Sequence, residues 1–247
     1  MAMGKSARAT VVVNVFGGPG CGKTAMAWEI CERLRREGFL VEYAPEYAKE
    51  LTWDASSKAA TELERSHARE LLDGRPDHQM AIVREQHRRI SRCIGQVDFV
   101  VTDGPLVQTL AYMRGADSKS PDIRRLYAKV REQTVELARL YPTFDLLAKR
   151  SGARDYPQAG TDYTRDQALA VDRTVRALLD ELCPRAGSYM SCGLDFAVRN
   201  MASVLWGARA ASRSTARDAG MEAVERAATR APGSPADRDE PDAARQR

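Results

Sequence analysis

The chain has 247 residues, of which 43% are hydrophobic and 29% charged, with a formal net charge of +4. These proportions are typical of a globular protein and exclude a largely disordered or fibrous chain. The five cysteines are odd in number and include no CxxC pair, which favours a reduced, cytoplasmic compartment. No apolar run approaches the ~20 residues of a membrane-spanning helix, so we expect no membrane partner.

The N-terminal half alternates between strand-like and helix-like segments. Residues 1–9 are expected to form a flexible arm. Residues 11–16 are a β-branched run, typical of a strand buried on both faces. A helix is expected over residues 24–37, with Gly38 ending it. The further elements expected here are a strand at 39–44, helices at 57–72 and 77–94, and a strand at 97–103.

The C-terminal half continues the alternation. A helix is expected after Pro105, and the spacing from Thr164 to Gln167 fits a capping box that opens another helix. The other elements expected are a helix at 122–140, strands at 144–149 and 188–192, and helices ending near Leu182 and Leu205. Residues 207–247 contain almost no large apolar side chain, which predicts a disordered tail.

Strands that alternate with helices predict an α/β fold, a parallel sheet flanked by helices, here over residues 10–206. Ligands bind such sheets at the carboxyl ends of the strands. A glycine-rich loop, Asp103 and the residues after Tyr43 all follow strands, so we expect them to lie together at that edge.

The glycine-rich loop reads GGPGCGKT and fits G-x-x-x-x-G-K-[ST] at every fixed position. A strand before it and a helix after it favour a phosphate-binding loop over a simple turn, because backbone N–H groups and a helix N-terminus then converge on the phosphates. Lys23 is expected to reach the β- and γ-phosphates of ATP, and the Thr24 hydroxyl to ligate Mg²⁺. The expected ATP-binding residues are Gly17, Gly18, Pro19, Gly20, Cys21, Gly22, Lys23 and Thr24.

Two carboxylates follow neighbouring strands. Asp103 ends the strand VDFVVTD, where a carboxylate orients Mg²⁺; the alternative is a helix cap. Glu46 follows the second strand and is a candidate to accept a proton from an attacking hydroxyl; the alternative is a solvated glutamate favoured by a helix dipole. Either carboxylate is a candidate to orient or deprotonate the acceptor. No second acid accompanies Asp103, which disfavours water as the acceptor.

Arginines mark the loop after the fourth strand. Arg150 and Arg154 are candidates to close over the triphosphate and neutralise developing charge; the alternative is a solvated basic loop. On the helix expected at 77–94, one group of side chains is a candidate lining for an acceptor pocket, the alternative again being a solvated face. Its members are Gln79, Arg84, Gln86 and His87.

Together, the segments GGPGCGKT, YAPEYAKEL, REQHRRI, VDFVVTDGPL and ALAVDRTVRALL resemble the P-loop kinases of the ribosylnicotinamide-kinase-like, AAA-domain branch. The resemblance covers about residues 10–206. Over the same span the chain is also similar to one phage type, the 5-hydroxymethyluracil DNA kinases. Relatives often have an arginine close behind the glutamate, where this chain offers Lys49. They also often have a serine where this chain has Gly104, and we expect Gly104 to leave room for a bulkier acceptor.

This resemblance implies an ATP- and Mg²⁺-dependent phosphotransferase acting on a primary hydroxyl of a nucleoside-type acceptor. The first acceptor it suggests is 5-hydroxymethyluracil in double-stranded phage DNA, a step in thymidine hypermodification, ahead of nicotinamide riboside and a free nucleotide. A DNA acceptor requires extrusion of the base and predicts strongly salt-dependent binding. The alternative from another class is a regulatory nucleotide-binding ATPase module, whose hydrolysis would be slow and independent of any acceptor.

Overall fold

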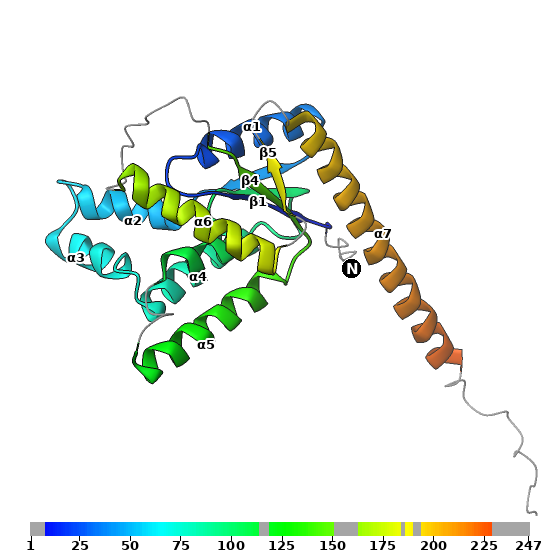
Figure 1. Ribbon diagram of the computed structural model, residues 1–247. Helices are drawn as coiled ribbons and strands as arrows, with labels where there is room; N and C mark the ends of the chain where they lie inside the picture. The colour runs from blue at the N-terminus through cyan, green and yellow to red at the C-terminus, as the bar shows by residue number, and fades with distance from the viewer. Residues whose placement is uncertain (1–7, 114–118, 151–162, 184–185, 190–193, 229–247) are drawn as a thin grey trace, which may run out of the picture. The chain divides into compact units, whose positions relative to one another are not determined.

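A computed structural model describes residues 8–113, 119–150, 163–183, 186–189 and 194–228 (Figure 1). Met1–Arg209 form one compact unit and Ala210–Arg247 a second. The first unit contains a five-stranded sheet in the order β2-β3-β1-β4-β5, in which every neighbouring pair is parallel. Helices flank this sheet, so the predicted α/β fold with a parallel sheet is confirmed.

The strand at the centre of the sheet leads into the glycine-rich loop. The strands are β1 (Val11–Phe16), β2 (Val41–Ala44), β3 (Phe99–Thr102), β4 (Thr143–Ala148) and β5 (Gly187–Tyr189). In the register of the sheet, Val13 lies beside Val101 on one side and Phe144 on the other. β1 therefore has hydrogen-bonded neighbours at both edges. All but one of its residues are buried, as predicted for a strand covered on both faces.

Helices cover both faces of the sheet (Figure 1). They are α1 (Lys23–Arg36), α2 (Tyr47–Ser56), α3 (Glu62–Leu71), α4 (Pro76–Ser91), η1 (Leu106–Tyr112, a 3₁₀ helix), α5 (Pro121–Ala138), α6 (Arg165–Leu182) and α7 (Leu194–Ala228). One core cluster joins Val11 and Val13 to buried residues of α1 and the start of α7. A second joins Val12 to residues of α4, η1, α5 and α6 on the opposite face. Alternate side chains of β1 thus supply both cores.

Three elements differ from the sequence prediction. α2 was not expected, because Pro45 reads as a break and the helix buries only Leu51. The segment after Pro105 is a 3₁₀ helix and not an α-helix. α7 continues to Ala228, past the expected end near Leu205 and into the expected tail, because the Ala and Arg residues of this segment have high helix propensity. Residues 229–247 of that tail lie outside the described residues.

Two arginines far apart in the sequence, Arg8 and Arg209, pair with one carboxylate directly before β3. Asp98 is buried and pairs with Arg8 at 2.8 Å and with Arg209 at 2.5 Å. Burial raises the pKa of Asp98, but the bonds with Arg8 and the Leu40 backbone outweigh it, so the pKa is lowered overall. Arg8 belongs to the expected flexible arm, yet it is held here; residues 1–7 lie outside the described part. None of the described helices is long and apolar enough to cross a membrane.

Candidate active site

The phosphate-binding motif folds as its sequence predicts. β1 ends at Phe16, a loop follows, and α1 begins at Lys23. Gly20 and Gly22 have φ values of 70° and 93°, the left-handed region that favours glycine. Gly17 has a φ of 146°, a conformation that other residues rarely adopt, and a Cβ there would lie 2.3 Å from the Cys21 sulfur. The loop therefore requires its glycines at these positions.

Lys23 is the buried cation of the loop. Only 8% of the residue is exposed, and its Nζ donates a hydrogen bond to the Gly18 carbonyl at 3.3 Å. Burial lowers the pKa of Lys23, but the neighbouring carboxylate of Glu46, together with Asp103, outweighs this and raises the pKa overall. Lys23 is therefore protonated at neutral pH and available to a bound anion.

Asp103 connects three elements at the end of β3. Its Oδ2 accepts a hydrogen bond from the Thr24 hydroxyl at 2.6 Å, and its Oδ1 accepts one from the Glu46 backbone N–H at 3.0 Å. Burial and the neighbouring Asp103 carboxylate together raise the pKa of Tyr43. Asp103 is only 1% exposed, so the fold has brought the two predicted metal-site residues into direct contact. A hydroxyl beside a carboxylate is a hard-oxygen pair that suits Mg²⁺.

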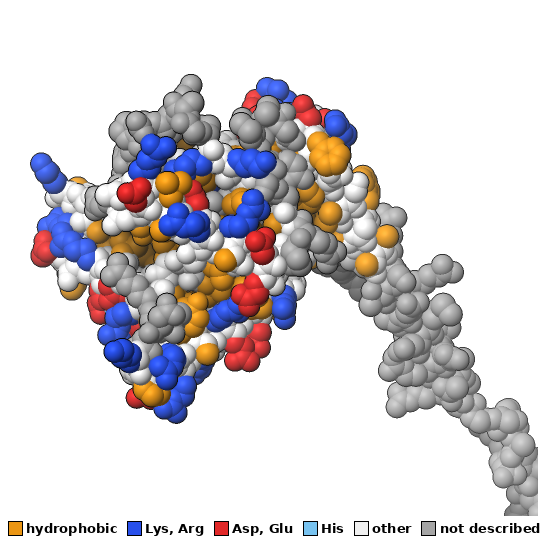
Figure 2. Space-filling view, in the orientation of Figure 1, with side chains coloured by type: hydrophobic (Ala, Val, Ile, Leu, Met, Phe, Trp, Pro, Cys, Tyr) orange, Lys and Arg blue, Asp and Glu red, His pale blue; other side chains and the backbone are white. Residues whose placement is uncertain are grey.

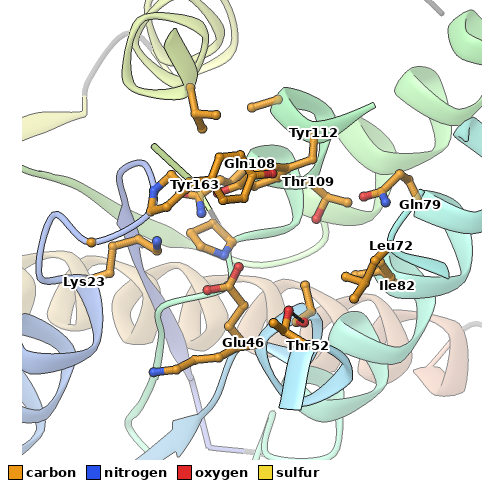
Figure 3. Close-up of a pocket in the computed structure, with 18 of the residues that line it drawn as sticks. Lys23, Glu46, Thr52, Leu72, Gln79, Ile82, Gln108, Thr109, Tyr112 and Tyr163 are labelled. Carbon is orange, nitrogen blue, oxygen red and sulfur yellow. Dashed lines mark hydrogen bonds between the residues drawn. The ribbon is translucent and has the colours of Figure 1, made fainter. Parts of the chain in front are cut away.

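Glu46 faces the phosphate loop from the start of α2, where it is the N-cap residue. Figure 3 shows its carboxylate and the Lys23 side chain pointing into the same space. Burial raises the pKa of Glu46, and the charge of Lys23 opposes that rise without cancelling it. The pKa is thus shifted toward neutrality, which strengthens a carboxylate as a proton acceptor.

Gly104 allows Glu46 to approach β3. A Cβ at this position would lie 2.9 Å from the Glu46 Cα and 3.1 Å from Gln86 Oε1. The space opened by this glycine is occupied by the Glu46 backbone, so the expectation that it leaves room for a bulkier acceptor is wrong.

We expect Gly104→Ala to push Glu46 away from Asp103, to lower the free energy of unfolding by about 1–3 kcal/mol and to reduce turnover. Urea unfolding and the transfer assay measure both effects. The matched control is Gly207→Ala, because Gly207 lies exposed in α7 with nothing within 4 Å of its added Cβ. That change should stabilise the protein by up to about 1 kcal/mol. Wild-type stability and turnover in Gly104→Ala would show that the close approach is not needed.

Arg150 holds the phosphate loop through Asp172 of α6. Its guanidinium donates to Asp172 at 2.8 Å and to the Pro19 carbonyl at 2.7 Å, while Asp172 accepts the Gly18 N–H at 2.8 Å. The structure therefore places Arg150 against the loop backbone. Arg154 lies outside the described residues. The role of Asp172 was not predicted, because its partner Gly18 is 154 positions away.

Removal of Asp172 should loosen this loop. Asp172→Ala leaves the Gly18 N–H and Arg150 without their partner, so we expect the free energy of unfolding to fall by about 1–3 kcal/mol and ATP to bind more weakly. Asp172→Asn keeps an acceptor for Gly18 and should be milder. Asp180→Ala, an exposed change on the same helix, is the control and should stay within about 0.5 kcal/mol of wild type. Calorimetry with an ATP analogue measures the change in affinity. If the Asp172 and Asp180 variants change stability and affinity equally, Asp172 does not hold the phosphate loop.

The loop opens into a cavity of about 710 Å³ that extends well beyond the phosphate end. Its far part is lined by α2, α4, η1 and α6, with Leu72, Ile82 and Met113 among the apolar side chains. The rings of Tyr112 and Tyr163 also line this cavity and meet edge to face, with centroids 6.5 Å apart. In Figure 2, hydrophobic side chains lie in the hollow between α2 and α6, with Lys and Arg side chains around it.

The candidate lining residues of α4 divide into two groups. Gln79 and Gln86 line the cavity as predicted. Arg84 is exposed and is not among the lining residues, and His87 stacks on Tyr141. Sequence reasoning missed Gln108, Tyr112 and Tyr163, because no motif marks them and only the folded chain brings them to the loop.

Comparisons with known proteins agree with this geometry. A model of a family described as an AAA domain matches residues 12–185. The chain is similar to thymidylate kinase from Candida albicans, with 11% identity, a TM-score of 0.54 and coverage of 81% of this chain and 95% of that one. It is also similar to thymidylate kinase from Ehrlichia chaffeensis (15% identity, TM-score 0.47, coverage 80% and 99%). The chain is similar as well to NadR in complex with NAD and AMP-PNP, with 15% identity and a TM-score of 0.48. That match covers 72% of this chain and 44% of the NadR chain, so this chain spans less than half of that protein.

The phosphate loop, the parallel sheet and the likeness to the Candida enzyme define a P-loop kinase-like fold. Since the family model covers most of the chain, the chain belongs to this AAA-domain family. No curated protein matches the sequence. At these identities the likeness to solved structures concerns the fold alone.

Proposed function

We propose that the protein is an ATP- and Mg²⁺-dependent phosphotransferase that acts on a primary hydroxyl of a nucleoside-type acceptor. The observation that carries this proposal is the shared cavity: Lys23 and the phosphate loop lie at one end, and apolar side chains, among them Leu72 and Ile82, line the other. Its volume of about 710 Å³ is within the range of pockets that hold small organic ligands.

The phosphate end supplies the groups that hold ATP. The loop amides and Lys23 bind the phosphates, and Thr24 with Asp103 would hold Mg²⁺, directly or through water. When bound, Mg²⁺ neutralises charge on the phosphate oxygens. Arg150 keeps the loop in shape through its bonds to Asp172 and Pro19. Arg154 is proposed to help close the site.

Glu46 is the better candidate for the base. Both oxygens of Asp103 already accept hydrogen bonds from the protein, whereas Glu46 lines the cavity and has a raised pKa. In the proposed reaction the acceptor oxygen attacks the γ-phosphorus, and the bond from that phosphorus to the β–γ bridging oxygen breaks. The hydroxyl proton passes to Glu46, and ADP leaves with the bridging oxygen.

The acceptor we propose first is 5-hydroxymethyluracil in double-stranded DNA, followed by nicotinamide riboside and a free nucleotide. A base stacked inside a duplex is out of reach of a recessed site, so it must leave the duplex before its hydroxymethyl group can reach Glu46. Support for this order comes from the sequence resemblance and the formal charge of +4.

Transfer of labelled γ-phosphate from ATP tests the proposal. The acceptors are duplex DNA with 5-hydroxymethyluracil, the same duplex with thymine, nicotinamide riboside and a panel of nucleosides and nucleotides. Label confined to the modified duplex supports the DNA kinase, and label on a small molecule moves the acceptor to that compound. Slow phosphate release with no labelled acceptor contradicts the kinase and favours the ATPase module.

A further inference from the structure

Three buried glutamines line the cavity, and their amide groups are used differently. Gln79, Gln86 and Gln108 are 4%, 2% and 2% exposed. Gln86 has both ends occupied: its Oε1 accepts the Tyr47 N–H at 2.8 Å, and its Nε2 donates to the Pro45 carbonyl at 3.2 Å. Gln86 is therefore part of the scaffold between α4 and α2.

Gln108 has only its oxygen occupied. Its Oε1 accepts the Gly17 N–H at 2.9 Å, whereas its buried Nε2 is the one buried side-chain N or O atom without a partner among the described residues. The amide cannot be reversed, because Gly17 offers a donor and needs the oxygen. A buried donor without a partner is unfavourable unless something completes it. Gln108 thus lies in the wall of the cavity beside the phosphate loop, with a buried NH₂ group that lacks a partner.

Gln79 has the opposite arrangement. Its Nε2 donates to the Leu71 carbonyl at 3.2 Å, in the last turn of α3. That carbonyl is an acceptor, so it fixes the NH₂ group toward the helix and leaves Oε1 for the cavity. Figure 3 shows Gln79 at the far wall, well away from Lys23, beside Ile82 and Leu72.

We propose that Gln108 and Gln79 determine which acceptor the cavity takes, Gln108 by donating to an oxygen of the acceptor and Gln79 by accepting an N–H of its heterocycle. This inference rests on the proposed function and deepens it. Gln108 lies beside the loop, where the reacting part of an acceptor must come. Gln79 lies at the far wall, beyond the edge-to-face pair of Tyr112 and Tyr163, where a flat ring fits.

The substrate class that follows is a heterocycle with a ring or carboxamide N–H at its far edge. A site in which an amide oxygen accepts an N–H of the ligand binds an analogue without that N–H more weakly, because the oxygen then has no hydrogen-bond donor. Replacement of that hydrogen by methyl removes the donor and changes little else in the ligand.

Binding of matched ligand pairs tests the assignment of Gln79 without turnover. The pairs are 5-hydroxymethyl-2′-deoxyuridine with its N3-methyl derivative, and nicotinamide riboside with its N,N-dimethylcarboxamide. Calorimetry on the wild-type chain with a non-hydrolysable ATP analogue should show at least one parent bound about tenfold or more tightly than its methylated partner. Gln79→Met should remove that preference. The control is Gln96→Met, since exposed Gln96 also donates to a helix carbonyl, that of Arg92 at 2.9 Å, and it should keep the preference.

Gln108→Leu should weaken the preferred parent about tenfold. It also removes the acceptor of the Gly17 N–H in the phosphate loop, so the ATP analogue should bind more weakly as well. Weaker binding of the ATP analogue with unchanged acceptor binding would overturn the role of Gln108. Equal binding within both pairs, no binding of either parent, or an unchanged preference in Gln79→Met would overturn the role of Gln79. Failure of the proposed function looks different, because it leaves the ligand preference intact while no label is transferred.

Discussion

Lys23→Met is expected to lower kcat/KM for phosphoryl transfer by about a hundred- to a thousandfold, because it removes a buried cation that stabilises charge on the transferring phosphoryl group. Lys23 is kept protonated by Glu46 and Asp103, and no other lysine or arginine among the described residues is as buried at the loop end of the cavity. Methionine keeps most of the side-chain volume, so the loss reports the charge. Steady-state kinetics with the best acceptor measure it.

The matched control for Lys23 is Lys129→Met. Lys129 is an exposed lysine of α5 that does not line the cavity. We expect that variant to transfer phosphate at the wild-type rate. A Lys23 variant within about threefold of wild type would mean that the buried lysine does not act on the phosphates, since the expected loss is at least a hundredfold.

Glu46→Gln is expected to lower kcat by about a hundred- to ten-thousandfold and to leave ATP binding intact, because a general base is lost while the phosphate loop is kept. The amide has the same shape but cannot accept the acceptor's proton. Activity requires the ionised carboxylate, so kcat/KM of the wild type should fall as the pH drops through the raised pKa of Glu46. The variant should lose this acidic limb of the pH profile.

Glu42→Gln is the control for the base. Glu42 is exposed on β2, four residues before Glu46, and is not among the residues that line the cavity. Its replacement should change neither kcat nor the pH profile. If Glu46→Gln transfers phosphate at the wild-type rate with the acidic limb preserved, the base is another group.

The parts of the site that depend on local sequence were predictable. The glycines of the phosphate loop, the strand before it and the helix after it all lie within one short segment, so their spacing carries the geometry. The contact between Thr24 and Asp103 also followed, because the carboxyl ends of parallel strands meet at one edge of the sheet.

The rest of the site depends on contacts between distant segments. Asp172 reaches Gly18 across 154 positions and Gln108 reaches Gly17 across 91, and a glutamine or an aspartate on a helix carries no mark of such a partner. The role of Gly104 was misjudged for the same reason, since only the folded chain shows that the Glu46 backbone fills the space beside it. α2 was missed because a single buried leucine gives no helical periodicity.

The central claim is that one cavity brings the ATP phosphates and a hydroxyl acceptor together. The most direct test is the ratio of phosphate transferred to ADP formed, measured in one reaction with labelled ATP and the best acceptor from the panel. The shared cavity predicts a ratio near one and ADP formation that rises with acceptor concentration. ADP formation that is independent of every acceptor, with all the label released as free phosphate, would contradict it.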